Sequence, residues 1–218
     1  MIISQHIPKT AGTSLMTSLR NAFGDRVLDH NSMPDLIYNS SFAELATAYD
    51  VVHGHIDLER APHVAHAASF IFTFLRDPVE RVISSYFYHT ALDAPEHPLV
   101  RQIRDQKLTL EEFADLPSQQ NLQYRMIRPV GREKIDFYGF VETYEASVRG
   151  LASKLAVDLG EVITKNTNPD KSVGRRYEIT DALRAYIAER NPKDRHLYEW
   201  ALKRSLGSKC YADKAFEK

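Results

Sequence analysis

The sequence contains very little cysteine: Cys210 is the single one among 218 residues. One cysteine cannot form a disulfide within the chain, and it excludes a zinc site made of four cysteine ligands. Proteins that work in a reducing compartment typically lack disulfides. We therefore expect a cytoplasmic protein.

Long hydrophobic runs and an excess of one charge are also missing from the sequence. No apolar run approaches the ~18 residues that a membrane-spanning helix requires, and the start of the chain lacks the basic and apolar regions of a signal peptide. Lys and Arg number 28 against 29 Asp and Glu, which gives a formal net charge of −1. This balance argues against nucleic acid or a membrane surface as a partner, so any anion site must be a local cluster.

The composition itself is that of an ordinary globular protein, with 43% hydrophobic and 26% charged residues. The length fits a single domain over residues 1–218. Strands are predicted over residues 1–6, 50–53, 69–75 and 136–141, and helices over 13–23, 41–49, 78–90, 109–116, 119–127, 143–159, 180–190 and 192–206. This alternation predicts an α/β fold whose C-terminal half is rich in helix.

The first candidate site is the segment HIPKTAGTS, between a predicted strand and a predicted helix. A helix N-terminus offers backbone N–H groups and a partial positive charge, and Gly12 lets an anion approach the backbone closely. Lys9 adds a full charge, while Thr10, Thr13 and Ser14 add hydroxyl donors. The alternative is a helix that simply follows a turn, with Lys9 in solvent. The segment is not a Walker A loop, because GxxxxGK[ST] is absent, and a magnesium–nucleotide site is poorly supported.

Arg76 and Ser84 form the second candidate site. Arg76 follows the most apolar predicted strand, at the carboxyl end where open α/β sheets bind ligands. Asp77 and Pro78 favour the start of a helix, which would carry Ser84 about two turns further on. A forked guanidinium and a hydroxyl at these positions could bind one phosphate. The alternative is that Arg76 pairs only with an acidic residue.

Two histidines, His53 and His55, mark the end of another predicted strand. Residues two apart in an extended segment face the same side, so the two imidazoles could be a base and its neighbour or two metal ligands. No third ligand with suitable spacing is evident, and we expect no metal. The alternative is that both are packing residues. Five later histidines are interpreted as surface or packing residues: His63, His66, His89, His97 and His196.

A basic segment late in the chain, residues 165–176, is the last candidate. It could close over an anionic cofactor, and it could equally be a solvated loop.

The segments HIPKTAGTS and FLRDPVERVISSYFY, in this order and with VHGH between them, resemble the sulfotransferase family. The similarity is greatest to the carbohydrate sulfotransferases of the heparan and uronyl 2-O type, and we expect a soluble bacterial-type member. FVETY at 140–144 and the region 168–198 also resemble the C-terminal pattern of the family. The resemblance implies a P-loop-like, three-layer fold in which helices flank a central parallel sheet.

In that family the first segment holds the 5′-phosphosulfate of 3′-phosphoadenosine 5′-phosphosulfate (PAPS), and the second holds the 3′-phosphate. The resemblance implies that Lys9 contacts the leaving-group oxygens and the sulfonate, and that Arg76 and Ser84 bind the 3′-phosphate. His55 would be the catalytic base, with His53 beside it. The residues implied for the 5′-phosphate are Thr10, Ala11, Gly12, Thr13 and Ser14.

The reaction that this resemblance implies moves a sulfonyl group from PAPS to a hydroxyl of a small-molecule or glycan acceptor, a carbohydrate above all. It leaves adenosine 3′,5′-bisphosphate (PAP) and needs no metal. One alternative is a P-loop nucleotide kinase or other phosphotransferase, which the missing GK[ST] sequence disfavours. The other is a non-catalytic nucleotide-binding module, in which His53 and His55 would be incidental.

Overall fold

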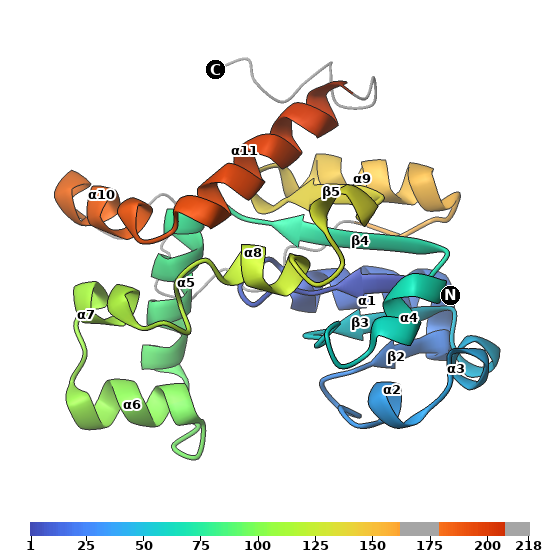
Figure 1. Ribbon diagram of the computed structural model, residues 1–218, viewed down its shortest axis with the longest axis horizontal. Coiled ribbons are helices and arrows are strands. Elements are labelled where there is room, and N and C mark those ends of the chain that lie inside the picture. Colours follow the sequence, from blue (N-terminus) through green and yellow to red (C-terminus); the bar gives the residue numbers. More distant parts are fainter. Residues whose placement is uncertain (162–178, 208–218) are drawn as a thin grey trace.

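Five parallel strands form one sheet in the computed structural model, which describes residues 1–161 and 179–207. Their order across the sheet is β2-β3-β1-β4-β5. The strands are β1 Ile2–Gln5, β2 Val27–Asp29, β3 Val51–Gly54, β4 Phe70–Leu75 and β5 Phe137–Phe140. Because every neighbouring pair is parallel, the carboxyl ends of all five strands lie at the same edge of the sheet (Figure 1).

The sequence of β4 explains its place inside the sheet. Its six residues, FIFTFL, are apolar apart from one threonine, and the last five are buried. Continuous apolar runs of this kind are typical of parallel strands that are covered on both faces. The threonine is Thr73, and its hydroxyl donates to the carbonyl of Gln5 in the neighbouring strand β1 (2.8 Å). The buried hydroxyl is therefore hydrogen-bonded. The predicted α/β fold with a central parallel sheet is confirmed.

Helices cover both faces of this sheet and give the predicted three layers (Figure 1). One face packs on α1 Gly12–Phe23 and α9 Tyr144–Leu155, in an apolar cluster that includes Leu15, Phe72 and Leu151. The opposite face packs in a second cluster that includes Ile71 and Leu197. The helices on that side are α2 Leu36–Asn39, α3 Phe42–Ala48, α4 Pro62–Ala67, α8 Leu122–Ile127 and α11 Pro192–Gly207.

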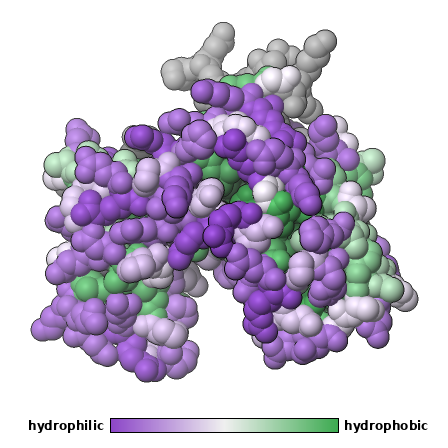
Figure 2. Space-filling view, viewed as in Figure 1, coloured by the Kyte–Doolittle hydropathy of each residue, from purple (hydrophilic) through white to green (hydrophobic). Residues whose placement is uncertain are grey.

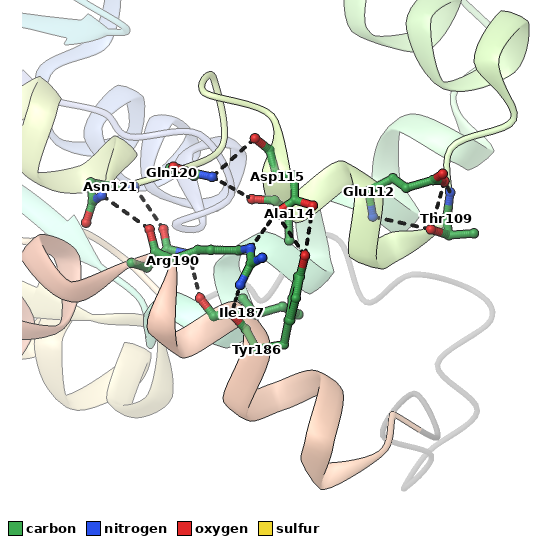
Figure 3. Close-up of polar contacts among 10 residues, drawn as sticks. Thr109, Glu112, Ala114, Asp115, Gln120, Asn121, Tyr186, Ile187 and Arg190 are labelled. Carbon is green, nitrogen blue, oxygen red and sulfur yellow. Dashed lines mark hydrogen bonds and ion pairs between the residues drawn. The ribbon is translucent and has the colours of Figure 1, made fainter.

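A separate helical lobe lies beyond the carboxyl edge of the sheet, at the left of Figure 1. It consists of α5 Pro78–Ala91, α6 Pro98–Gln106, α7 Leu110–Asp115 and α10 Asp181–Glu189, around an apolar cluster of its own. Polar contacts also attach α10 to α7 (Figure 3). Asp115 accepts a hydrogen bond from the Tyr186 hydroxyl (2.8 Å) and forms an ion pair with Arg190. Helix α10 is thereby attached to α7, although about 70 positions of the chain separate Asp115 from Tyr186.

Several elements differ from the predictions. β2, α2, α4 and α6 were not predicted; β2 has three residues and α2 four, which is too short for a hydrophobic period to be recognised. The helix predicted over 143–159 ends at Leu155, because Ala156 adopts a left-handed conformation with φ 54°. The helix predicted over 119–127 begins only at Leu122. The basic segment 165–176 lies outside the described residues.

Within residues 1–161 and 179–207, no helix is long and apolar enough to cross a membrane.

Candidate functional site

The loop between β1 and α1 has an unusual backbone. Lys9 and Ala11 both have positive φ angles, 71° and 66°, which non-glycine residues adopt at a cost of about 1–3 kcal/mol each. The Thr10 hydroxyl between them donates to the Ile7 carbonyl (2.8 Å) and holds the turn. Turns that mix left- and right-handed residues form concave surfaces of backbone N–H groups, which bind anions.

The start of α1 faces the same loop without a compensating negative group. Ala11 is the N-cap and has no capping side chain, and the first turn contains no acidic residue. The predicted site residues Thr13 and Ser14 lie in this first turn, Thr13 exposed and Ser14 buried. A helix N-terminus with these properties favours an anion.

Arg76 and Lys9 contact each other although they follow different strands, β4 and β1. Arg76 follows β4 directly, and its Nη1 atom is 3.4 Å from the Lys9 carbonyl oxygen, to which it donates. The Lys9 ammonium lies over the ring of Tyr88 on α5, 3.5 Å from the ring centroid. Ser84 is half-buried one helical turn before Tyr88, so the two residues share a face of α5. The structure therefore brings the two predicted phosphate segments to one place.

The start of α5 agrees with its prediction. The side chain of Asp77 caps the helix by accepting the N–H of Glu80 (3.0 Å), and Pro78 occupies the first turn. The N–H of Asp77 donates to Glu142, two residues after the end of β5 (2.8 Å). Glu142 also accepts a hydrogen bond from the hydroxyl of Tyr198 on α11 (2.9 Å). Glu142, within the FVETY segment, thus ties three elements together at this edge.

Three histidine rings lie in a row at the ends of β1 and β3. The ring of His6 stacks on that of His53, with centroids 5.2 Å apart, and contacts that of His55 at 4.7 Å. His6 also packs against α1, since a Cβ atom at Gly12 would lie 2.0 Å from its Nε2 atom. A side chain at position 12 would therefore displace the His6 ring. His6 begins the first segment but was not predicted as a site residue, because its contacts with His53 and His55 depend on β3 lying beside β1.

The two predicted histidines have different surroundings. His53 is buried, and its Nδ1 atom is 2.7 Å from the Ser4 hydroxyl. His55 is exposed and reaches a pocket. Burial lowers the pKa of His53 to about 4, and burial followed by the charges of His53 and His55 holds the pKa of His6 well below its usual value. Although the residue as a whole is exposed, its ring is partly desolvated and lies against His6, and this loss of hydration, then the nearby His30, lowers the pKa of His55. All three imidazoles are therefore neutral at pH 7, and of the two predicted residues His55 is the accessible one.

A pocket of about 720 Å³ opens beside His55, and Figure 2 shows the surface hollowed below α8, between the helical lobe and the strands β2 and β3. This volume is typical of sites for small molecules. Its walls come from the segment after β3 and from α8. The charged residues in the lining are Asp57, Glu59, Arg125, Arg128 and Lys193. Glu59 and Arg128 form an ion pair with each other, which leaves Asp57 against two cations.

The described residues contain no group of three or more His, Cys, Asp or Glu placed to hold a metal ion.

Comparison with known proteins adds to this geometry. A model of the sulfotransferase family matches residues 1–201. The chain belongs to the sulfotransferase family. No curated protein matches this sulfotransferase. Among solved structures, it is similar to the crystal structure of a sulfotransferase from Alicyclobacillus acidocaldarius, with 18% identity, a TM-score of 0.49, and coverage of 94% of this chain and 97% of that one.

Proposed function

We propose that this sulfotransferase uses PAPS as its donor and transfers the sulfonyl group to a hydroxyl of a carbohydrate acceptor, leaving PAP. The observation that carries the proposal is the convergence of Lys9, Arg76 and His55 at one edge of the sheet, after β1, β4 and β3. Two cations, Lys9 and Arg76, could then bind the phosphates of the nucleotide. The neutral base, His55, would lie at the same loop between β1 and α1.

The residues at this edge fit such a donor. The uncapped N-terminus of α1 and the loop before it would hold the 5′-phosphate through Ala11, Gly12, Thr13 and Ser14. Thr10 would shape this loop rather than bind the phosphate, since its N–H and hydroxyl both donate to the Ile7 carbonyl. Arg76 and Ser84 would hold the 3′-phosphate, Arg76 as a forked donor and Ser84 as a hydroxyl. We expect no metal requirement, because Lys9 and the helix terminus supply positive charge at the leaving group.

His55 is the proposed base. Its neutral imidazole would accept the proton of the acceptor hydroxyl while that oxygen forms its bond to sulfur. The bond between sulfur and the bridging oxygen breaks, and its electron pair goes to the 5′-phosphate. Lys9 would offset the charge that grows on this oxygen, which is a contribution made mainly in the transition state. His53, buried against Ser4, would position the row of rings rather than take the proton.

The pocket beside His55 supports a small saccharide as acceptor. It combines an aromatic ring, Tyr124, with charged side chains such as Asp57 and Arg125. A sugar can stack a ring face on the aromatic residue and bond its hydroxyls to the carboxylate and the guanidinium. His55 itself lines the pocket.

A turnover assay tests the proposal. The protein is incubated with PAPS and with sugars, phenols and simple alcohols, and PAP formation is measured. We expect PAP to form in the presence of a sugar. Turnover with phenols alone would contradict the carbohydrate acceptor, and PAP binding without turnover on any acceptor would favour a non-catalytic module.

A further inference from the structure

Gln123, on α8, makes two hydrogen bonds to the backbone of Arg76. The Arg76 N–H donates to Gln123 Oε1 (3.0 Å), and Gln123 Nε2 donates to the Arg76 carbonyl (2.8 Å). Gln123 is fully buried, so water does not compete for either bond. Arg76 is the first residue after β4, where the paired strand ends at Leu75. The Gln123 side chain therefore continues the backbone pairing that the sheet no longer supplies.

The position of Gln123 is itself fixed by α11. The buried carboxylate of Asp194 accepts the backbone N–H groups of Gln123 (3.3 Å) and Tyr124 (2.7 Å) at the start of α8. In return, Asn121 accepts the N–H groups of Lys193 (2.8 Å) and Asp194 (3.3 Å) at the start of α11. The two helix starts cap each other, and Figure 3 shows Asn121 joined to the end of α10 as well.

A buried arginine reinforces this arrangement. Arg81, on α5, is fully buried, and its Nη2 atom donates to the Gln119 carbonyl just before α8 (2.5 Å). The charge of Asp194 acts on Arg81 and opposes the lowering of its pKa by burial. Helices α5, α8 and α11 thus meet at one junction, from which Gln123 holds the backbone of Arg76.

We propose that Gln123 is the positioning residue that aims Arg76 at the 3′-phosphate, and so determines the preference for a 3′-phosphorylated nucleotide. This inference rests on the proposed function, in which Arg76 binds that phosphate. With both backbone groups of Arg76 tied, its side chain leaves the sheet from a fixed point, and its Nη1 atom reaches the Lys9 carbonyl. Without Gln123, rotation of the Arg76 backbone would let the guanidinium leave the loop.

The test compares PAP with 5′-AMP, which lacks the 3′-phosphate. Gln123→Met keeps the length of the side chain and removes both hydrogen bonds, and calorimetry gives the dissociation constant of each nucleotide. A charge-assisted hydrogen bond is worth roughly 10- to 100-fold in affinity. We expect Gln123→Met to raise the dissociation constant of PAP by about tenfold or more, and that of 5′-AMP by less than about threefold. The matched control is Gln119→Met, a buried glutamine whose amide donates to Ser118 rather than to Arg76.

A double-mutant cycle with Arg76→Ala shows whether Gln123 acts through Arg76. In the Arg76→Ala background, Gln123→Met should change the ratio of PAP to 5′-AMP affinity by less than about twofold. If Gln123→Met does not fold, Gln123→Glu replaces it, since a carboxylate can accept the Arg76 N–H but cannot donate to its carbonyl.

The possible outcomes distinguish a failure of the positioning role from a failure of the proposed function. If the single substitution Gln123→Met removes the preference for PAP over 5′-AMP, the positioning role is supported. If Arg76→Ala loses the preference but Gln123→Met keeps it, or if both nucleotides weaken equally, the positioning role is wrong and the proposed function stands. If the unmodified protein does not distinguish PAP from 5′-AMP, the proposed function is wrong. The positioning role of Gln123 is then wrong as well, because it depends on that function.

Discussion

Truncating His55 should separate catalysis from folding and from nucleotide binding. His55→Ala removes an exposed ring whose contact is with His6, while the backbone N–H that donates to Asn31 (3.3 Å) remains. Surface substitutions of this kind typically change stability by within ~0.5 kcal/mol, which is ~1–2 °C in the melting midpoint of a protein this size. Losing a general base typically costs ~10²–10⁴-fold in rate. We therefore expect turnover to fall by that factor with PAP affinity nearly unchanged.

The assay measures PAP formation from PAPS and a saturating acceptor across pH. His55 has a pKa below its ordinary value of 6.5, so the unmodified protein should keep its rate down to below pH 6.5 and lose it as the ring becomes protonated. This acid limb should be missing in His55→Ala and present in the control His66→Ala, which removes another exposed histidine. Near-normal turnover of His55→Ala would refute the base assignment.

Three further predictions follow from the same region. Lys9→Ala should lower the rate constant more than it weakens PAP binding, because charge grows on the leaving oxygen in the transition state; equal losses would make Lys9 a simple phosphate contact. Gly12→Ala should destabilise the fold by about 1–3 kcal/mol in urea unfolding, since its Cβ would lie 2.0 Å from the His6 ring; an unchanged midpoint would mean that His6 is free to move. Stability should also fall as pH drops from 6.5 to about 4, because unfolded His53 binds a proton that the folded form, with its pKa lowered to about 4, does not. The loss is about 3 kcal/mol at ~1.4 kcal/mol per pKa unit, and it should be clearly smaller in His53→Gln.

Local sequence signals predicted much of this fold because their physical causes are local. The FIFTFL run is apolar enough to identify a buried strand without knowledge of its neighbours. Asp77 and Pro78 predict a helix start from capping and a fixed φ angle, and the structure has both. The two candidate phosphate segments were predicted to lie between a strand and a helix, and the structure places them between β1 and α1 and between β4 and α5.

What the sequence could not supply depends on which distant segments meet. His6 and His55 are 49 positions apart and come together because β1 lies beside β3. Gln123 is one of several polar residues around α8, and its importance becomes visible only when the helix docks on the end of β4, 47 positions away. No periodicity or local motif marks such contacts.

The binding of PAP tests the central claim most directly, and thermal unfolding measures it without an acceptor. A ligand at about 100 times its dissociation constant adds ~2.7 kcal/mol to stability, and ~1 kcal/mol moves the midpoint by roughly 2–4 °C in a protein of this size. Saturating PAP, without magnesium, should therefore raise the midpoint by roughly 5–11 °C. 5′-AMP should raise it much less, and Arg76→Ala should remove most of that difference. A larger shift with magnesium and ATP than with PAP would contradict the account, as would no shift with any nucleotide.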